Sequence, residues 1–269
     1  MRHLLDSLAI DDLAIRRLQS FEAEALAMSP DGYWLAFSGG KDSVVILDLA
    51  KRAGVKFQAN YSLTTVDPPE LVWFVKTFPE VAIHRPAETM WQLIRRNGMP
   101  PRRNARYCCA ALKESGGGGH IVITGVRWAE SARRSKRQMM EACHRSRLGR
   151  KLFHPIIEWS TSDVWQYIRE RGLRYCSLYD EGFRRLGCVL CPMQTQAQTE
   201  RDRERFPKLC AQWERTVKST FRPATMEHGF RTAEEYWQWW LDRDAEKLDS
   251  SPVLFEDNPE LSEPGLEAG

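Results

Sequence analysis

The sequence lacks the apolar segments that direct proteins into or across membranes. It contains no run of the roughly 18 apolar residues that a transmembrane helix needs. Its start, MRHLLDSLAIDDLAIRRLQS, has neither a long apolar core nor a small-residue cleavage site, so it does not resemble a signal peptide. We therefore expect a cytoplasmic protein without a membrane partner.

The sequence has little net charge, only +3, and 42% of its 269 residues are hydrophobic. This composition argues against a disordered chain and leaves enough apolar side chains for a substantial core. The length suits one large α/β domain with an appendage, or two small domains.

Apolar strand-like segments alternate with amphipathic helical segments through most of the chain. This alternation predicts an α/β fold, with a parallel twisted sheet and helices on both faces. We expect the helical pattern at 10–28 to be one helix, FHPIIEW at 153–159 to be extended, and the pattern at about 195–220 to be helical. The expected parts are an N-terminal helix at 1–32, an α/β domain at 33–192, a helical C-terminal extension at 193–249 and a flexible acidic tail at 250–269.

A glycine-rich segment, SGGKDS, joins the first predicted strand at 33–37 to the helix that ends at Gly54. It fits neither the Walker A spacing nor the G-x-G-x-x-G fingerprint. Glycines let the backbone approach an anion, and the following helix directs its N-terminal N–H groups towards it. Lys41 adds positive charge, and Asp42 can orient the helix start or hold a hydrated Mg²⁺. The predicted phosphate-binding residues are Ser38, Gly39, Gly40, Lys41, Asp42 and Ser43.

In this position, SGGKDS resembles the loop of the PP-loop ATP pyrophosphatases. In that family the loop grips the β,γ-pyrophosphate of ATP, and attack falls on the α-phosphate. The resemblance therefore implies ATP with Mg²⁺ as the bound nucleotide.

Seven cysteines are present, and four of them suggest a metal site. Cys188 and Cys191 form a C-x-x-C motif, and Cys108 and Cys109 are adjacent. Four thiolates suit a [4Fe–4S] cluster or a structural Zn²⁺, although an adjacent pair is unusual for zinc. The other three, which we expect to be packed or surface thiols, are Cys143, Cys176 and Cys210.

Three passages resemble the phosphoadenosine-phosphosulfate reductase family, within the same PP-loop superfamily. They are GVRWAESARR at 125–134, LRYCSLYDEGFRRLGCVLCP at 173–192, and the pair Cys108–Cys109. The last stands where the iron–sulfur members of that family carry their own Cys-Cys pair. The resemblance implies a fold like that of the adenine nucleotide alpha-hydrolases and a [4Fe–4S] cluster on the four cysteines. It also implies that Arg127, Ser131 and Arg134 bind the anionic part of the nucleotide. Asp67, after the second predicted strand, is a weaker candidate for contacting the adenosine.

Two features depart from sulfonucleotide reductases. No cysteine follows Cys210, whereas those enzymes carry a nucleophilic cysteine in a C-terminal Glu-Cys-Gly motif. The Gly-Lys-Asp core of the loop, which those reductases have lost, is intact here. The combination is similar to the iron–sulfur PP-loop protein of DNA phosphorothioation. It implies an ATP pyrophosphatase that activates an acceptor for sulfur transfer, with Lys41, Asp42, Arg127 and Arg134 as catalytic residues.

Two other functions remain open at this point. One is a sulfonucleotide reductase that uses an external thiol, and the other is a nucleotide-binding module whose cluster senses redox state. Residues 127–151 hold nine Arg or Lys against two Glu, which favours a polyanion such as tRNA or DNA as acceptor. Partner proteins of a sulfur-modification system and oligomer formation are further possibilities.

Overall fold

The computed structural model describes residues 9–114, 116–142, 149–223 and 229–242. The chain divides into two compact units, Met1–Thr89 with Ala111–Cys188 and Met90–Ala110 with Val189–Gly269. The predicted acidic tail and Cys143 lie outside the described residues.

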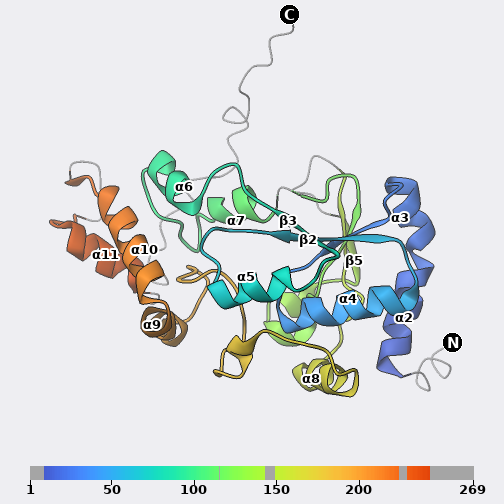
Figure 1. The fold of residues 1–269 in the computed structure, drawn as a ribbon. Helices are drawn as coiled ribbons and strands as arrows, with labels where there is room; N and C mark the ends of the chain where they lie inside the picture. The colour runs from blue at the N-terminus through green and yellow to red at the C-terminus, as the bar shows by residue number, and fades with distance from the viewer. Residues whose placement is uncertain (1–8, 115, 143–148, 224–228, 243–269) are drawn as a thin grey trace, which may run out of the picture. The chain divides into compact units, whose positions relative to one another are not determined.

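Within the described residues, the first unit contains one six-stranded sheet in the order β3-β2-β1-β4-β6-β5 (Figure 1). Neighbouring strands pair in parallel, except that β5 runs antiparallel to β6 at the edge. This confirms the predicted α/β fold with a mainly parallel sheet. The strands are β1 (Tyr33–Ala36), β2 (Phe57–Ser62), β3 (Val81–His84), β4 (Ile121–Ile123), β5 (Met140–Ala142) and β6 (Lys151–Phe153).

Helices α2 and α8 pack against α4, and Figure 1 shows α4 and α5 along one face of the sheet. The apolar residues from Val44 to Leu47, together with Leu49, are buried in the core, and Gly54 ends the helix in the left-handed conformation, with φ 69°. The helices are α2 (Ile10–Ser20), α3 (Glu22–Met28), α4 (Lys41–Ala53), α5 (Pro69–Lys76) and α8 (Thr161–Glu170), with 3₁₀ turns η1 (Trp128–Glu130), η2 (Arg134–Lys136) and η3 (Ser177–Tyr179).

Two predictions about the first unit were wrong. The helix expected at 10–28 is interrupted at Phe21, whose ring packs edge-on against Phe153 with the centroids 5.3 Å apart. The segment expected to be extended at 153–159 belongs to β6 only at Phe153. Turn hydrogen bonds from Ile157 N to His154 O and from Trp159 N to Ile156 O shape the rest.

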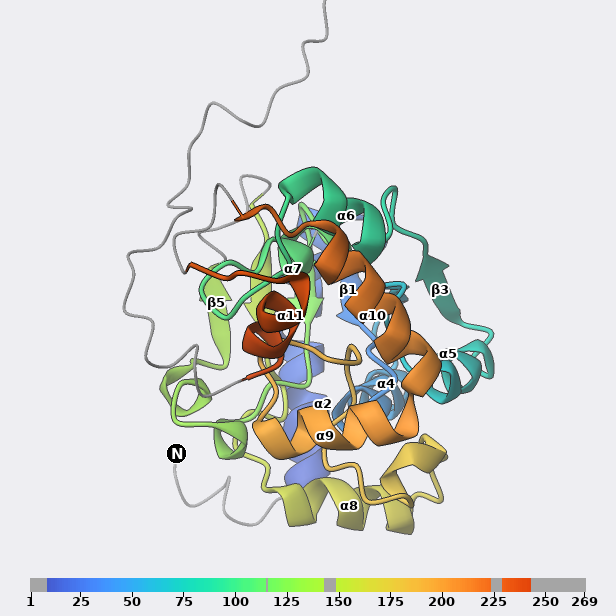
Figure 2. The same cartoon turned by 90° about the vertical axis from the view of Figure 1, so that its left-hand side faces the viewer.

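The second unit contains α6 (Met90–Asn97), the start of α7 (Tyr107–Leu112), α9 (Gln196–Arg205), α10 (Pro207–Ser219) and α11 (Ala233–Leu241). Helix α10 lies against α6, α9 and α11 (Figure 2). Its Trp213 ring stacks on Trp240 with the centroids 5.0 Å apart, so tryptophans form much of this core. The helical pattern at 195–220 is divided at Phe206, because Pro207 begins a new helix.

No helix in the described part of the chain combines the length and the apolar character that crossing a membrane requires.

Candidate functional site

The loop Ser38–Ser43 follows β1, which lies between β2 and β4, and leads directly into α4. Gly39 has φ +72°, and a Cβ there would lie 2.6 Å from Leu71 Cδ1 and 2.8 Å from Val75 Cγ2. Any side chain at this position would therefore combine backbone strain with a steric clash. The position requires glycine, and the loop keeps a bare backbone.

The hydroxyls of the loop hold its turn together. Ser43 Oγ donates to Gly40 O at 2.7 Å, and Gly40 N donates to Ser38 Oγ at 3.4 Å. Gly40 precedes α4 without a side-chain cap. A helix start of this kind, following bare backbone, suits an anion.

The carboxylate of Asp42 lies between two cations. Lys41 Nζ donates to Asp42 Oδ2 at 2.9 Å, and Arg127 Nε donates to Asp42 Oδ1 at 2.7 Å. Arg127 is only 1% exposed, and its Nη1 also donates to the Trp159 carbonyl at 3.0 Å. The absence of a side chain at Gly125 permits this approach, because a Cβ there would lie 2.8 Å from Asp42 Cβ.

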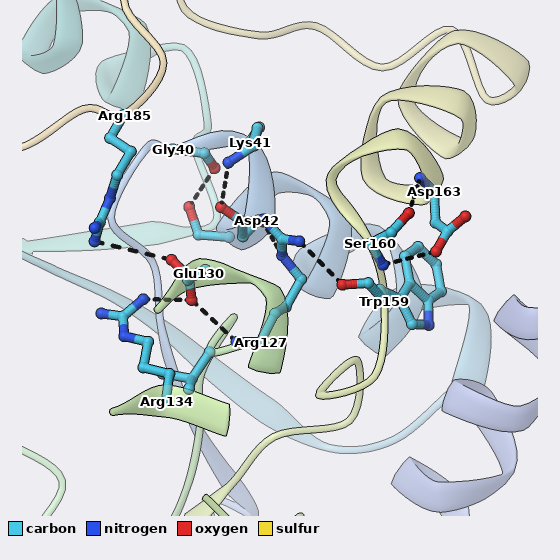
Figure 3. Close-up of polar contacts among 12 residues, drawn as sticks. Gly40, Lys41, Asp42, Arg127, Glu130, Arg134, Trp159, Ser160, Asp163 and Arg185 are labelled. Atoms are coloured by element: carbon cyan, nitrogen blue, oxygen red, sulfur yellow. Dashed lines mark hydrogen bonds and ion pairs between the residues drawn. The ribbon is translucent and has the colours of Figure 1, made fainter. Parts of the chain in front are cut away.

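Glu130 extends this charged network to two further arginines (Figure 3). Its carboxylate accepts the Arg127 backbone N–H at 3.0 Å and forms an ion pair with Arg134. Arg185 Nη2 lies 3.8 Å from Glu130 Oε1. Arg134 and Arg185 side chains are 35% and 58% exposed, so the outer end of the network is accessible.

The predicted residues thus fall into different groups. Direct bonds join Lys41, Asp42 and Arg127, and Glu130 links Arg134 to them. Ser131 is exposed, and its Oγ accepts the Arg134 backbone N–H at 3.2 Å.

Asp67 lies in the turn after β2 and is bound to that turn. Its Oδ2 accepts the Thr64 backbone N–H at 2.6 Å, and the Asp67 side chain is largely buried. The Cys188 thiol donates to Thr64 Oγ1 at 3.4 Å, so this turn also contacts one of the predicted cluster cysteines. An adenosine contact by Asp67 stays a prediction.

The four predicted cluster cysteines are divided between the units. Cys188 ends the first unit, whereas Cys108, Cys109 and Cys191 belong to the second. Among the described residues, no group of three or more His, Cys, Asp or Glu is positioned to hold a metal ion. The cluster therefore stays a prediction that rests on the donor set, four thiols with a C-x-x-C pair.

Cys176 and Cys210 are buried, which agrees with ordinary packing. Burial raises the pKa of both thiols, that of Cys210 to about 12. Both are therefore protonated and poorly reactive at neutral pH.

His154 follows β6 and is 1% exposed. Burial lowers its pKa from 6.5 to about 4, so the ring is neutral at neutral pH. One ring nitrogen, Nδ1, lies 2.7 Å from Thr124 Oγ1.

Basic side chains of the segment 127–151 make contacts with other residues of the chain. Arg150 Nη1 donates to the carbonyls of Glu114 and Gly116, both at 3.0 Å. Lys151 pairs with Glu24. The carbonyls orient Arg150 without neutralising it, whereas Glu24 reduces the positive charge that Lys151 offers to a polyanion.

Sequence reasoning missed three residues of the site, namely Glu130, Tyr179 and Arg185. Glu130 stands inside GVRWAESARR, and the other two stand inside the block at 173–192. Lys41 N donates to Tyr179 Oη at 2.9 Å, a contact across 138 positions of sequence. The motifs marked the right segments, but only the fold identifies which side chains face the loop.

Comparison with known families identifies one that covers more than half of the chain. A model described as phosphoadenosine phosphosulfate reductase domain matches residues 32–194. This span includes the loop, the charged network and all four predicted cluster cysteines.

Individual relatives are distant. An uncharacterized protein of Methanocaldococcus jannaschii is 26% identical over 262 residues, and a second is 28% identical over 194 residues. The match covers 85% and 68% of this chain but only 52% and 47% of those proteins, so the chain spans about half their length. A phosphoadenosine 5'-phosphosulfate reductase of Gloeobacter violaceus is 28% identical, with 62% of this chain and 73% of that protein covered.

Among solved structures, the phosphoadenylyl-sulfate reductase of Candida auris, a phosphate complex, has a TM-score of 0.50 at 20% identity. The match covers 68% of this chain and 90% of that chain. At this level of identity the similarity supports the fold.

Proposed function

Because the chain belongs to the phosphoadenosine phosphosulfate reductase domain family, we propose that it is an enzyme acting on an adenylyl nucleotide bound at Ser38–Ser43. The observation that carries the proposal is the loop with its charged network. Lys41 is 5% exposed, and its ammonium group pairs with Asp42, which Arg127 holds in turn at the start of α4. Such a preorganised cation suits an anionic substrate.

A sulfonucleotide is the substrate class that the comparisons support better. The family description and the Gloeobacter relative both carry the name of a sulfonucleotide reductase, and another relative is an adenosine 5'-phosphosulfate reductase of Oceanobacillus iheyensis. In this reaction a thiol attacks the sulfur of the phosphosulfate group, and the adenosine nucleotide leaves. A second thiol then releases sulfite and forms a disulfide, which balances the two electrons.

ATP is the second candidate, and the residues of the loop favour it. The segment keeps the Gly40-Lys41-Asp42 core that a β,γ-pyrophosphate requires in the resembling ATP pyrophosphatases. Attack on the α-phosphate would release pyrophosphate and transfer AMP to an oxygen of the acceptor. That oxygen would then become a good leaving group for sulfur.

The side chains have the same roles in both reactions. Lys41 Nζ neutralises phosphate charge, while Asp42 positions it and Arg127 rather than acting on the substrate. Arg134, at the accessible end of the network, binds a second anionic group. Each Asp42 oxygen accepts one N–H group and retains a lone pair, so a hydrated Mg²⁺ can bind there through water.

We further propose that Cys108, Cys109, Cys188 and Cys191 hold a [4Fe–4S] cluster, which would supply electrons or a sulfur-binding iron. The donor set supports this, because four thiolates match such a cluster. The hydroxyl of Thr64, 3.4 Å from Cys188 Sγ, is suited to donate to a thiolate sulfur and orient it.

The acceptor that we propose for the ATP reaction is a nucleic acid, supported by the basic residues of 127–151. Arg145 and Arg147 of this segment lie outside the described residues. Binding to tRNA or duplex DNA should weaken with salt. The logarithm of the binding constant should fall with the logarithm of the salt concentration, with a slope of about 0.7 to 0.9 per phosphate contact. No binding at low salt would leave a small molecule as the acceptor.

Product analysis distinguishes the candidates. Anaerobically purified protein would be incubated separately with ATP and Mg²⁺, adenylyl sulfate and phosphoadenosine phosphosulfate, each with and without a dithiol. Sulfite formed only with dithiol would establish the reductase, and AMP with pyrophosphate would establish ATP cleavage. Lys41→Ala should remove either activity. If the wild-type protein binds none of these nucleotides, the proposed function is wrong, whereas binding without turnover would favour a redox-sensing module.

A further inference from the structure

We propose that Tyr179 is an additional substrate-binding residue, whose hydroxyl donates a hydrogen bond to the anionic group held by the loop Ser38–Ser43. This inference rests on the proposed function, because it assumes that the loop binds an adenylyl nucleotide. It adds a neutral donor to a site otherwise described by backbone N–H groups and cations.

The direction of the hydroxyl follows from the contact that it already makes. Lys41 N–H donates to Tyr179 Oη at 2.9 Å, which occupies a lone pair of the oxygen and leaves the O–H hydrogen to donate. Within the described part of the chain, no residue accepts that hydrogen. The hydroxyl therefore stands at the first N–H of α4 with a donor still to be used.

The phenol hydroxyl lies close to the loop backbone at Gly40. A Cβ at Gly40 would lie 3.4 Å from Tyr179 Oη, which is an ordinary contact distance. Lys41 Nζ lies 6.0 Å from the centre of the Tyr179 ring. The hydroxyl and the ammonium group thus lie at the same end of the loop, where a phosphate or sulfate group can contact both.

The Tyr179 ring is held from behind. Trp165 packs edge-on against it with the centroids 5.1 Å apart, and Tyr175 does the same at 6.3 Å. The Gly182 backbone N–H donates to Tyr179 O at 3.1 Å, which fixes the turn η3. Because the ring is fixed before substrate arrives, the donor costs little ordering when it binds. Burial also raises the pKa of the phenol, so it keeps its hydrogen at neutral pH.

The chain provides a matched pair of variants. Tyr179→Phe removes the hydroxyl and keeps the ring against Trp165. Tyr175→Phe does the same to a neighbouring ring of the same aromatic group, but its hydroxyl donates to Asp180 Oδ1 at 3.0 Å, away from the loop. Both variants preserve the packing, so melting temperatures should stay close to that of the wild-type protein.

The experiment is calorimetric titration of the wild-type chain and both variants with ATP, adenylyl sulfate and AMP. Of ATP and adenylyl sulfate, one will bind the wild-type chain more tightly. Tyr179→Phe should raise the dissociation constant of that nucleotide about tenfold, because one hydrogen bond to a charged group is lost. It should leave AMP unchanged, because AMP lacks the second anionic group. Tyr175→Phe should bind all three as the wild-type protein does.

Three outcomes would overturn the inference. Wild-type affinity in Tyr179→Phe would refute the contact. Equal weakening in both variants would assign the effect to aromatic packing rather than to the hydroxyl. If the wild-type chain itself binds neither ATP nor adenylyl sulfate, the proposed function fails first, and this result is distinct from the other two.

Discussion

Replacing Arg127 by Met tests whether the buried charge network supports the first unit. The guanidinium is 2% exposed and bonds to Asp42 Oδ1 and the Trp159 carbonyl. In the variant, the Trp159 carbonyl would lose this hydrogen-bond donor, and Asp42 would keep its ion pair with Lys41 but lose the one with Arg127. Removing one partner of a buried ion pair costs about 3–5 kcal/mol. Since Asp42 is 18% exposed and keeps Lys41, we expect the lower end, about 3 kcal/mol.

The measurement is the free energy of unfolding in urea, followed by far-UV circular dichroism. Because the chain has two compact units, one unfolding curve can combine two transitions. Hydrogen exchange in the peptide that covers Ile121–Ile123 would therefore accompany it, since that strand leads into the network. Exchange there should accelerate in Arg127→Met, while exchange in α10 should stay unchanged.

Arg134→Met is the matched control. Its ion pair with Glu130 is partly exposed, and such pairs contribute about 0–1 kcal/mol. A double-mutant cycle with Asp42→Asn should give a coupling to Arg127 of at least about 1 kcal/mol. If Arg127→Met costs no more than Arg134→Met, or the coupling is absent, the network does not hold the loop as we describe.

Three further predictions concern pH, the loop and the cysteines. Burial lowers the pKa of His154 from 6.5 to about 4, so between these pH values the unfolded chain binds a proton that the folded chain does not. The free energy of unfolding should therefore keep the whole His154 contribution above about pH 6.5 and fall by up to about 3 kcal/mol towards pH 4. Urea titrations would measure this fall, and His154→Gln should flatten it. Gly39→Ala should weaken nucleotide binding and should lower the melting temperature by more than Gly54→Ala does. Gly54 is the control because it also has a positive φ, but a Cβ there would meet no neighbour within 4 Å. Protein purified without oxygen should be brown with about four irons per chain; Cys188→Ser should bleach it and Cys210→Ser should not, and a colourless zinc protein would contradict the cluster.

The sequence predicted the loop and α4 well because their causes are local. A glycine turn after an apolar strand, followed by an apolar run, determines the strand, turn and helix. The helix begins at Lys41, since Gly40 supplies the extended conformation that precedes the first turn. Such details depend on backbone angles that neighbouring residues set.

The errors arose where distant contacts decide the structure. β5 consists of only three residues, Met140–Ala142, which is too short to establish a periodic pattern, and it is defined by its pairing with β6. The interruption at Phe21 places its ring on Phe153, which is far away in the sequence. Neither effect leaves a periodic pattern, so no local analysis could have predicted them.

The division of labour among the arginines also depends on the fold. Arg127 is 85 positions from Asp42, and from sequence it is simply an arginine near a predicted nucleotide site. In the structure its Nε and Nη1 are already bonded and its side chain is buried, so an anion could reach it only by displacing Asp42 or through Nη2. Arg134 and Arg185 keep accessible guanidinium groups, and Glu130 can release them to a stronger anion at a small cost. Substrate contact is therefore expected at the accessible arginines, with Arg127 determining where the loop and its lysine lie.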